Sequence, residues 1–326
     1  MKTLRSDVAV IGGGPAGMAA ALSASKAGAR VALIDRNRHL GGILNQCIHD
    51  GFGLFRFGKL MTGPEYAGVF ADEIKADAGI ETLLDTMAID VSSGKRITCA
   101  SRNGMCRVEA GAVVFATGCR ERTRGAIAIP GTRPSGIYTA GTAQYLMNVR
   151  NIGVGGKAVI LGSGDVGLIM ARRLVLSGVE VACVLEKEAK CGGLPRNVYQ
   201  CVEDYGIPLY LRRTVTEIRG RKRLESVVAA DVDDKGMPVS GGEREIACDT
   251  LILSVGLIPE NELAGKAGVE LEPETNGMKA DDRLETNVPG LFGCGNALHV
   301  NDLVDNVSCE GEVAGKWAAA GARRLS

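Results

Sequence analysis

The chain has no excess charge of either sign and no apolar run long enough to cross a membrane. Lys+Arg and Asp+Glu both total 38 among its 326 residues, so no basic surplus would attract nucleic acid or an anionic membrane surface. A spanning helix needs about 20 consecutive apolar residues, and the sequence has no such segment. We therefore expect no nucleic-acid partner and no membrane span.

The ten cysteines include no pair spaced as Cys-x-x-Cys. This absence argues against a zinc knuckle and against a thioredoxin-like redox pair, so we predict no metal site. Irregularly spaced cysteines are more typical of reduced thiols in a cytoplasm than of a disulfide scaffold. Because the start, Met1-Lys2-Thr3, leads directly into an apolar strand, we expect no signal peptide. We expect a cytoplasmic protein.

A Gly-x-Gly-x-x-Gly motif occurs twice, as Gly12-x-Gly14-x-x-Gly17 and as Gly162-x-Gly164-x-x-Gly167. Each copy follows a short apolar strand and opens a predicted helix, 16–27 or 166–177. Each helix stops at a glycine, and a second apolar strand then ends in an acid, Asp35 or Glu186. One such motif alone is weak evidence, but two complete units in the same order are strong evidence for two dinucleotide sites.

The order of residue types in each unit has a physical reason. The first glycine allows a tight turn, the second lets the backbone approach a pyrophosphate, and the third lets the helix pack closely on the strand. The helix N-terminus offers free N–H groups and the positive end of its dipole to the phosphates. The carboxylate after the second strand accepts hydrogen bonds from ribose hydroxyls.

The remaining segments predict an α/β protein with two Rossmann-like three-layer domains. Apolar strands at 112–116 and 250–255 follow the two units, and short strands are expected around 81–90, 96–100 and 106–110. Helices are expected at 65–78, 139–150 and 306–323. The tail strand, within 288–296, has no fingerprint of its own and should return to the first domain. We expect one domain at 1–122 and 254–326, with 123–253 inserted as the second.

Taken together, these segments resemble the two-dinucleotide flavoproteins of the pyridine nucleotide-disulfide oxidoreductase superfamily, which includes thioredoxin reductase and glutathione reductase. The resemblance rests on both fingerprints, on Ala116-Thr117-Gly118, and on the stretch 286–296, which reads TNVPGLFGCGN. It implies FAD at the first fingerprint and NAD(P)H at the second. The late stretch would approach the flavin ribityl chain, with Asn296 where the family usually has Asp.

The resemblance carries the cofactor-binding residues over to this sequence. Glu186 would accept a hydrogen bond from a free ribose 2′-hydroxyl and repel a 2′-phosphate, which favours NAD over NADP, although Lys187 acts against this. The N-terminus of the closing helix should point at the flavin and favour its anionic reduced form. The predicted residues are Gly12, Gly14, Pro15, Ala16, Gly17, Asp35, Arg36, Gly42, Ala116, Thr117, Gly118, Gly162, Gly164, Asp165, Val166, Gly167, Glu186, Lys187, Gly256, Gly295, Asn296, Asn306 and Val307.

The redox disulfides of that superfamily have no counterpart in the matching stretches. Cys47 is the only cysteine among residues 41–47, and residues 130–150 contain no cysteine. A bound flavin would therefore pass electrons directly to something else. Cys47, His49 and His299 are the candidate catalytic residues. The alternatives are a structural role for Cys47 and plain hydrogen bonding for each histidine.

Stretches 42–53, 60–67, 136–144 and 295–305 resemble one branch of the superfamily more closely. That branch contains the FAD/NAD-binding subunits of dye-linked proline dehydrogenase, opine oxidase, hydrogen cyanide synthase and glycerol-3-phosphate-dehydrogenase-associated oxidoreductases. The resemblance implies a subunit that exchanges electrons between NAD(H) and a second flavoprotein or small redox protein. Two alternatives stay open: a stand-alone NADH oxidase or quinone/dye reductase, and a non-catalytic FAD-containing assembly subunit.

Overall fold

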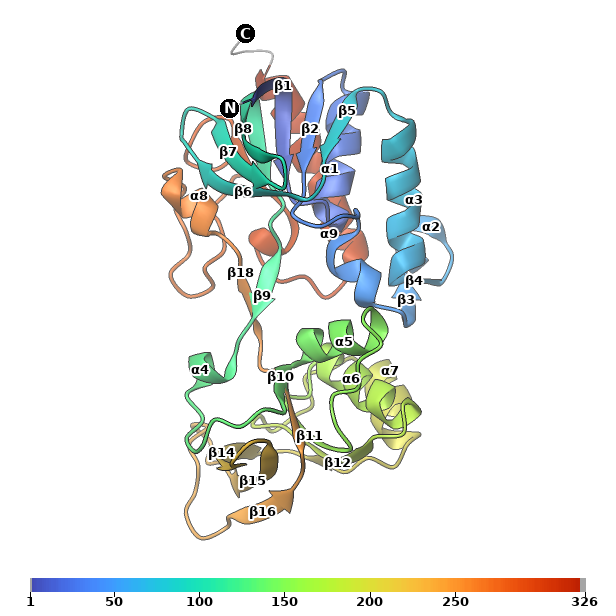
Figure 1. Cartoon of the computed structure of the whole chain (residues 1–326), viewed down its shortest axis with the longest axis vertical. Coiled ribbons are helices and arrows are strands. Elements are labelled where there is room, and N and C mark those ends of the chain that lie inside the picture. Colours follow the sequence, from blue (N-terminus) through green and yellow to red (C-terminus); the bar gives the residue numbers. More distant parts are fainter. Residues whose placement is uncertain (1, 323–326) are drawn as a thin grey trace. The chain divides into compact units, whose positions relative to one another are not determined.

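A computed structural model describes residues 2–322 and divides the chain into two compact units. The first unit combines Met1–Arg120 with Ile258–Ser326, and the second is Glu121–Leu257. The second unit is thus inserted into the sequence of the first. Both units are mixed α/β structures built on a mainly parallel sheet (Figure 1), so the predicted fold class is confirmed.

The first unit has a seven-stranded sheet in the order β5-β2-β1-β8-β7-β6, with β19 also paired to β8. Because β19 runs parallel to the end of β8, the tail returns to the first sheet as predicted. The strands are β1 (Lys2–Ile11), β2 (Val31–Ile34), β5 (Ile80–Leu83), β6 (Thr86–Val91), β7 (Arg96–Ser101), β8 (Gly104–Phe115) and β19 (Leu291–Gly293).

Strand β8 corrects one expectation from the sequence. Separate strands were expected at 106–110 and 112–116, but β8 runs through Gly111 without a break. Its partner β1 pairs on both sides of that glycine, Ser6 with Ala110 and Val8 with Ala112. Pairing to a continuous neighbour therefore outweighs the weak strand preference of one glycine.

Successive side chains of β1 point to opposite faces of the sheet and pack into two separate hydrophobic clusters. Val8 and Val10 pack against the helical side, whereas Ala9 and Ile11 pack against the other. Both faces of the strand are buried, as is typical of parallel sheets. The helical layer contains α1 (Pro15–Lys26), α3 (Gly63–Ala76) and α9 (Val304–Ala322), and β6, β7 and α8 (Glu262–Lys266) contribute to the opposite side (Figure 1).

The second unit repeats this plan. Its parallel sheet has the order β10-β17-β11-β12-β13, helices pack on one face, and a three-stranded antiparallel sheet packs on the other. Its strands are β10 (Ile137–Thr139), β11 (Lys157–Leu161), β12 (Glu180–Leu185), β13 (Leu209–Tyr210), β14 (Arg213–Gly220), β15 (Leu224–Asp231), β16 (Arg244–Ala247) and β17 (Thr250–Leu253). Its main helices are α5 (Ala140–Asn148) and α6 (Asp165–Leu176).

The helices expected from the sequence are present with small shifts in their ends. Helix α3 starts at Gly63 rather than 65, because Thr62 and Glu65 form a capping box there. The closing helix starts at Val304, two residues before its expected start. Its expected last residue, Arg323, lies outside the described residues.

Short elements complete the chain. They are η1 (Gly42–Gln46), β3 (Asp50–Phe52), α2 (Leu54–Phe57), β4 (Met61–Thr62), β9 (Cys119–Glu121), α4 (Arg124–Ile127), α7 (Pro195–Val198), η2 (Tyr199–Glu203), β18 (Leu257–Pro259) and η3 (Gly295–Ala297). Among residues 2–322, no helix combines the length and apolar character needed to cross a membrane. In the same range, no group of three or more His, Cys, Asp or Glu side chains could hold a metal ion.

Candidate dinucleotide sites

The first fingerprint forms a tight turn between β1 and α1. Gly12 has φ +109°, and a Cβ there would overlap the carbonyl oxygen of Ala116 at the end of β8. A Cβ on Gly17 would overlap the carbonyl oxygen of Gly12. By contrast, a Cβ on Gly14 would meet nothing within 4 Å. The first and third glycines are therefore required by packing, and the second leaves open space for a ligand.

Helix α1 presents its N-terminus at this open space. Gly14 caps the helix without a side-chain hydrogen bond, so the first N–H groups of the helix have no side-chain acceptor at the cap. Gly41 donates its N–H to the carbonyl oxygen of Gly13 at 2.7 Å. The adjacent Gly42 lies so close that a Cβ on it would be 3.0 Å from the Gly14 Cα atom. The loop after β2 therefore borders the glycine turn of the first fingerprint.

Asp35 is fixed beside the same turn. It is 6% exposed, and its Oδ2 accepts the Gly13 N–H at 2.6 Å while its Oδ1 accepts the Asn37 N–H at 2.7 Å. A carboxylate has about four acceptor positions, so both oxygens keep capacity for ribose hydroxyls. Arg36 follows directly and is exposed.

Helix α9 packs parallel to α1 at unusually short range. A Cβ on Gly311 would overlap the Ala16 carbonyl oxygen, and a Cβ on Gly315 would overlap that of Ala20. These two contacts advance in the same direction along both helices. Starting from the Gly311–Ala16 contact, α9 extends six residues further toward its N-terminus than α1 does, which is roughly 9 Å. The N-termini of the two parallel helices are thus staggered along the helix direction.

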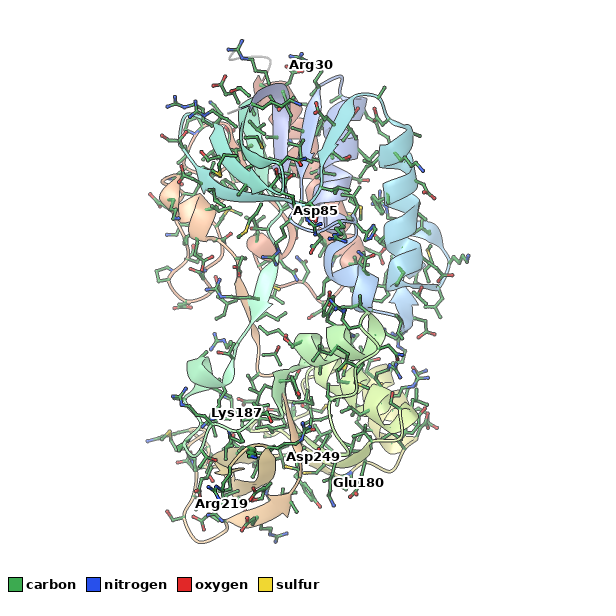
Figure 2. The ribbon with its side chains drawn as sticks, viewed as in Figure 1. Arg30, Asp85, Glu180, Lys187, Arg219 and Asp249 are labelled. Carbon is green, nitrogen blue, oxygen red and sulfur yellow. The ribbon has the colours of Figure 1, made fainter. Side chains whose placement is uncertain are left out.

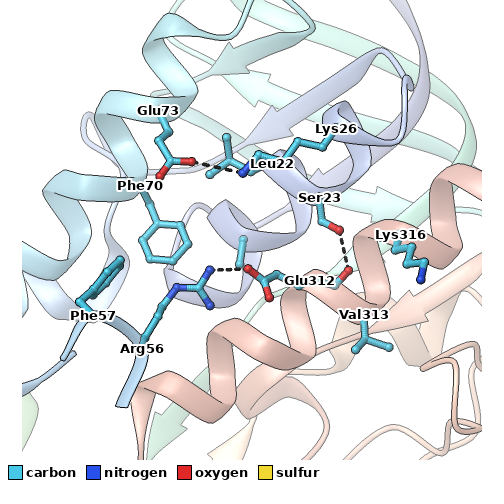
Figure 3. Close-up of a pocket in the computed structure, with 11 residues that line it drawn as sticks. Leu22, Ser23, Lys26, Arg56, Phe57, Phe70, Glu73, Glu312, Val313 and Lys316 are labelled. Carbon is cyan, nitrogen blue, oxygen red and sulfur yellow. Dashed lines mark hydrogen bonds and ion pairs between the residues drawn. The ribbon is translucent and has the colours of Figure 1, made fainter. Parts of the chain in front are cut away.

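Side chains hold α9 in this position (Figure 3). Ser23 of α1 donates its hydroxyl to the Glu312 carbonyl oxygen at 2.7 Å, and Arg56 of α2 pairs with the Glu312 carboxylate. The buried Tyr66 hydroxyl hydrogen-bonds Ser308 at 2.8 Å. A pocket of about 340 Å³ lies among these helices. Because its acids are already paired, Glu312 with Arg56 and Glu73 with Lys26, we assign this pocket to helix packing.

Two buried polar atoms near the helix ends have no hydrogen-bond partner in the protein. They are Oγ1 of Thr117, the second residue after β8, and Oδ1 of Asp305, in the first turn of α9. A buried polar atom without a partner costs about 1–3 kcal/mol. Thr117 and Asp305 lie next to Ala116 and Asn306, which the resemblance places at FAD. A polar ligand such as FAD fits this cradle, since its hydroxyl and amide groups could satisfy both atoms.

Two of the candidate catalytic residues lie in the loop that follows the first fingerprint unit. Cys47 donates its thiol to the Ile43 carbonyl oxygen at 3.4 Å, and burial raises its pKa to about 12. The thiol is thus protonated near neutral pH, which disfavours a nucleophilic thiolate. His49 Nδ1 lies 2.8 Å from the Asp50 carbonyl oxygen, and its ring centroid is 5.1 Å from that of Phe52.

The turn after β19 carries Asn296 and His299. Asn296 accepts the Asn301 N–H at 3.0 Å and donates its amide to the Cys119 sulfur at 3.5 Å. An ionised Asp at this position would have no N–H to donate to the sulfur. Glu310 of α9 accepts the N–H of Gly295 at 2.8 Å and lies 3.2 Å from Nε2 of His299. The histidine is 61% exposed.

The second fingerprint reproduces the first in detail. A Cβ on Gly162, which has φ +99°, would overlap the carbonyl oxygen of Ser254 at the end of β17. Glu186 is 8% exposed. Its Oε2 accepts the Ser163 N–H at 2.8 Å, and its Oε1 accepts the Glu188 N–H at 2.9 Å. In both sites the carboxylate of the acid, Asp35 or Glu186, therefore accepts two backbone N–H groups. One comes from the residue after the first glycine, and the other comes from the second residue after the acid.

A second glycine pair was missed by the sequence reasoning. Gly192-Gly193 borders the second turn: Gly192 donates its N–H to the Ser163 hydroxyl at 2.9 Å, and a Cβ on Gly193 would lie 3.0 Å from the Ser163 carbonyl oxygen. These glycines stand six and seven residues after Glu186, the same spacing as Gly41-Gly42 after Asp35. That repeated spacing was the available signal.

The second site differs from the first at the helix start. Asp165 is the first residue of α6, where α1 has Pro15. Its Oδ1 accepts the Leu194 N–H at 2.7 Å and the Asn197 side-chain amide at 2.8 Å. Val166 follows it in the same turn of the helix and is 39% exposed. A carboxylate at this helix N-terminus competes with a phosphate for the same positive potential.

Lys187 and Gly256 complete the predicted set. Lys187, labelled in Figure 2, lies in the second unit with its side chain 61% exposed. Its Nζ lies 3.6 Å from a carboxylate oxygen of Glu188. Gly256 has φ +102°, and its counterpart after β8, Gly118, has φ +73°. After β8 and after β17, the chain therefore leaves the sheet through a glycine with positive φ.

Comparison with known proteins identifies a family and several relatives. The profile described as pyridine nucleotide-disulphide oxidoreductase matches residues 6–313. An opine oxidase subunit from Agrobacterium tumefaciens (strain Ach5) is 30% identical over 283 residues, which cover 82% of this chain and 55% of the relative. Hydrogen cyanide synthase subunit HcnB of Pseudomonas protegens is 28% identical, covering 80% and 58%. The chain spans about half the length of these relatives.

Solved structures share the fold over nearly the whole chain. Thioredoxin reductase of T. acidophilum matches with a TM-score of 0.79 at 24% identity, covering 99% of each chain. L-proline dehydrogenase from P. horikoshii matches with a TM-score of 0.66 at 21% identity, covering 97% of this chain and 55% of the other. The fold thus has two Rossmann-like domains, as predicted.

Proposed function

Because the chain belongs to the pyridine nucleotide-disulphide oxidoreductase family, we propose that it binds FAD at the first fingerprint and NAD(H) at the second, and exchanges electrons with a partner protein. Enzymes of this family depend on FAD and a pyridine nucleotide, and the chain is an FAD-dependent oxidoreductase. The assignment of each cofactor to its site and the identity of the partner are the parts that we propose.

The observation that carries the proposal is the match between the two nucleotide cradles. In each, a glycine turn of left-handed backbone meets a strand-end carbonyl, and a buried carboxylate is fixed beside the turn. In the first cradle the long helix α9 packs directly against the backbone of the fingerprint helix, whereas the helix beside α6 in the second, α5, is shorter and contacts it through side chains. The first site therefore suits the longer ligand, FAD, and the second suits a nucleotide that binds reversibly.

The protein contributes binding, orientation and electrostatics to the reaction. When bound, FAD and NAD(H) supply hydride transfer between nicotinamide and flavin. The N-terminus of α1 would hold the FAD pyrophosphate. The first turn of α9, which starts at Val304 and includes Asn306 and Val307, would stabilise negative charge on the reduced flavin. Thr117 and Asp305 offer their unpartnered oxygens to the same ligand.

Glu186 supports NAD over NADP. Its fixed carboxylate keeps acceptor capacity for a ribose 2′-hydroxyl and would repel a 2′-phosphate. Lys187 weakens this preference less than the sequence alone suggests, since its ammonium group lies near Glu188. Asp165 at the start of α6 should also lower affinity for any pyrophosphate, which suits reversible binding at the second site.

The partner is proposed from two observations. Both curated relatives described above are named as subunits, and the chain has no Cys-x-x-Cys pair to carry electrons onward. We propose a second flavoprotein subunit or small redox protein as the partner. We also propose a cytoplasmic location, which suits ten free cysteines.

A matched pair of variants tests the two site assignments. Gly12→Ala should abolish FAD binding and leave NADH binding intact, because its Cβ fills only the first turn. Gly162→Ala should do the reverse. The amount of tightly bound flavin is measured from the visible absorbance spectrum, and NADH binding is measured by calorimetry. Circular dichroism is the control for folding. Loss of both ligands in a folded variant, or of neither, would refute the assignment.

The same preparations separate the alternatives for electron transfer. If the unmodified chain reduces oxygen rapidly with NADH and needs no other protein, the stand-alone oxidase replaces our proposal. If the bound flavin is not reduced by NADH at all, a non-catalytic role in assembly replaces it. Slow reaction with oxygen together with fast reduction by NADH supports a dedicated partner.

A further inference from the structure

Two cysteines outside the nucleotide sites lie directly opposite each other in the first unit. Cys99 of β7 and Cys106 of β8 are paired residues in the antiparallel register. Both are free thiols. Cys99 is 0% exposed, and Cys106 is partly exposed and packs against the same core cluster. The pair therefore combines a buried thiol with one that solvent can reach.

The spacing of paired strands suits a covalent bond between these side chains. Directly opposite residues have Cα atoms about 4.5–5.5 Å apart, within the range of about 4.4–6.8 Å found for disulfides. Their Cβ atoms lie about 4.5–5.5 Å apart, and a disulfide needs about 3.5–4.5 Å. A small approach of the two strands would therefore close the bond, and the resulting strain would make it easy to reduce.

The thiols already influence each other. Burial raises the pKa of Cys99 to about 12, and the charge and hydrogen bond of the neighbouring Cys106 are smaller contributions to the same rise. Cys99 is therefore unreactive by itself near neutral pH, and Cys106 is the thiol that a solvent oxidant meets first.

A second pair provides a comparison inside the same chain. Cys183 of β12 and Cys248, which precedes β17, also interact, since Cys183 contributes to the raised pKa of Cys248. Both are buried, at 2% and 4% exposure. Strand β12 pairs with β11 and β13, so these cysteines are not cross-strand partners. A soluble oxidant has access to neither of them.

We propose that Cys99 and Cys106 form a reversible cross-strand disulfide when the protein meets hydrogen peroxide. The Cys106 sulfur attacks one peroxide oxygen as the O–O bond breaks, and the thiol proton passes to the other oxygen, which leaves as water; Cys106 is then a sulfenic acid. The Cys99 sulfur then attacks the Cys106 sulfur, and its proton leaves with the departing hydroxide as a second water. Two thiols are oxidised, one peroxide is reduced, and a dithiol reductant such as dithiothreitol reverses the change.

Trypsin provides a direct test, because Arg96, Arg102 and Arg107 bracket the two cysteines. Complete digestion separates residues 97–102 from residues 103–107, and each peptide holds one cysteine. The full-length protein is treated with hydrogen peroxide, free thiols are blocked with iodoacetamide, and the digest is analysed without reductant. We expect the two peptides joined by a disulfide, and separate again after dithiothreitol. Oxidation of Met105 adds an oxygen atom to the peptide of residues 103–107, and this mass increase is scored separately from the disulfide.

Variants and internal references make the result decisive. Cys106→Ser and Cys99→Ala should each abolish the linked peptides, and in Cys99→Ala the sulfenic acid of Cys106 should be trapped by dimedone. Cys309, which is exposed, reports that peroxide has reacted, and the Cys183 and Cys248 peptides should stay reduced. Linkage of Cys106 to any other cysteine, or no linked peptides while Cys309 is oxidised, would overturn the proposal. This outcome does not depend on FAD or NAD(H) binding.

Discussion

Substitution of Gly311 by alanine should destabilise the first unit and weaken its FAD site. In α9, the added Cβ would lie less than 3.0 Å from the Ala16 carbonyl oxygen, a separation that real Cβ atoms essentially never show. It would also lie 3.1 Å from the Ala16 Cα atom. These atoms are backbone of the fingerprint helix and cannot rotate away. Helix α9 must therefore move off α1, which displaces its N-terminus from the flavin position.

The size of the effect follows from two opposing contributions. Overpacking against backbone costs up to about 3 kcal/mol. Replacement of a helix-interior glycine by alanine returns about 1 kcal/mol of helix propensity. The net loss of about 2 kcal/mol should lower the melting temperature of a unit of this size by roughly 4–8 °C.

Gly68 of α3 offers a matched control, since it is also a glycine inside a helix. A Cβ on Gly68 would meet nothing within 4 Å, so Gly68→Ala keeps only the favourable contribution and should raise the melting temperature by roughly 2–4 °C. Both variants are compared by thermal unfolding with saturating FAD and by FAD titration of the apoprotein. If Gly311→Ala is as stable as the unmodified protein and binds FAD equally well, the proposed close packing of α1 and α9 is wrong.

Two further predictions concern the second nucleotide site and alkaline pH. Glu186→Gln should shift the ratio of NADPH to NADH dissociation constants toward NADPH by about tenfold, because a negative charge beside the 2′-phosphate is removed; an unchanged ratio in calorimetry would contradict the role of Glu186. Burial raises the pKa of Cys99 and Cys248 to about 12 and of Cys183 to about 11, from 9.0. The unfolded thiols lose their protons first, so this stability is present below pH 9 and is lost between pH 9 and 12. Urea unfolding should show a fall of about 1 kcal/mol per thiol between pH 9 and 10, and a flat profile would show that these thiols are not buried.

The local parts of both sites could be predicted from the sequence because they repeat. Helices α1 and α6 begin at Pro15 and Asp165, one residue before their expected starts, since Gly14 and Gly164 act as the caps. The break expected near Gly111 was wrong, because strand pairing with β1 is a property of the whole sheet rather than of the local sequence.

The contacts that hold α9 could not be predicted from the sequence. The pairs Arg56–Glu312 and Tyr66–Ser308 join residues separated by 256 and 242 positions, and no local pattern links them. The Asn296 bond to Cys119 is similarly remote. Such contacts depend on how the returning C-terminal segment packs on the first sheet, and the sequence pattern indicates only that it returns.

Anaerobic titration of the purified flavin-containing protein with NADH, and separately with NADPH, tests the central claim most directly. We expect that NADH bleaches the visible flavin absorbance with about one equivalent per bound FAD, and that NADPH does so only at much higher concentration. A protein that holds FAD but is bleached by neither nucleotide would contradict the claim that its two sites work together in one oxidoreductase.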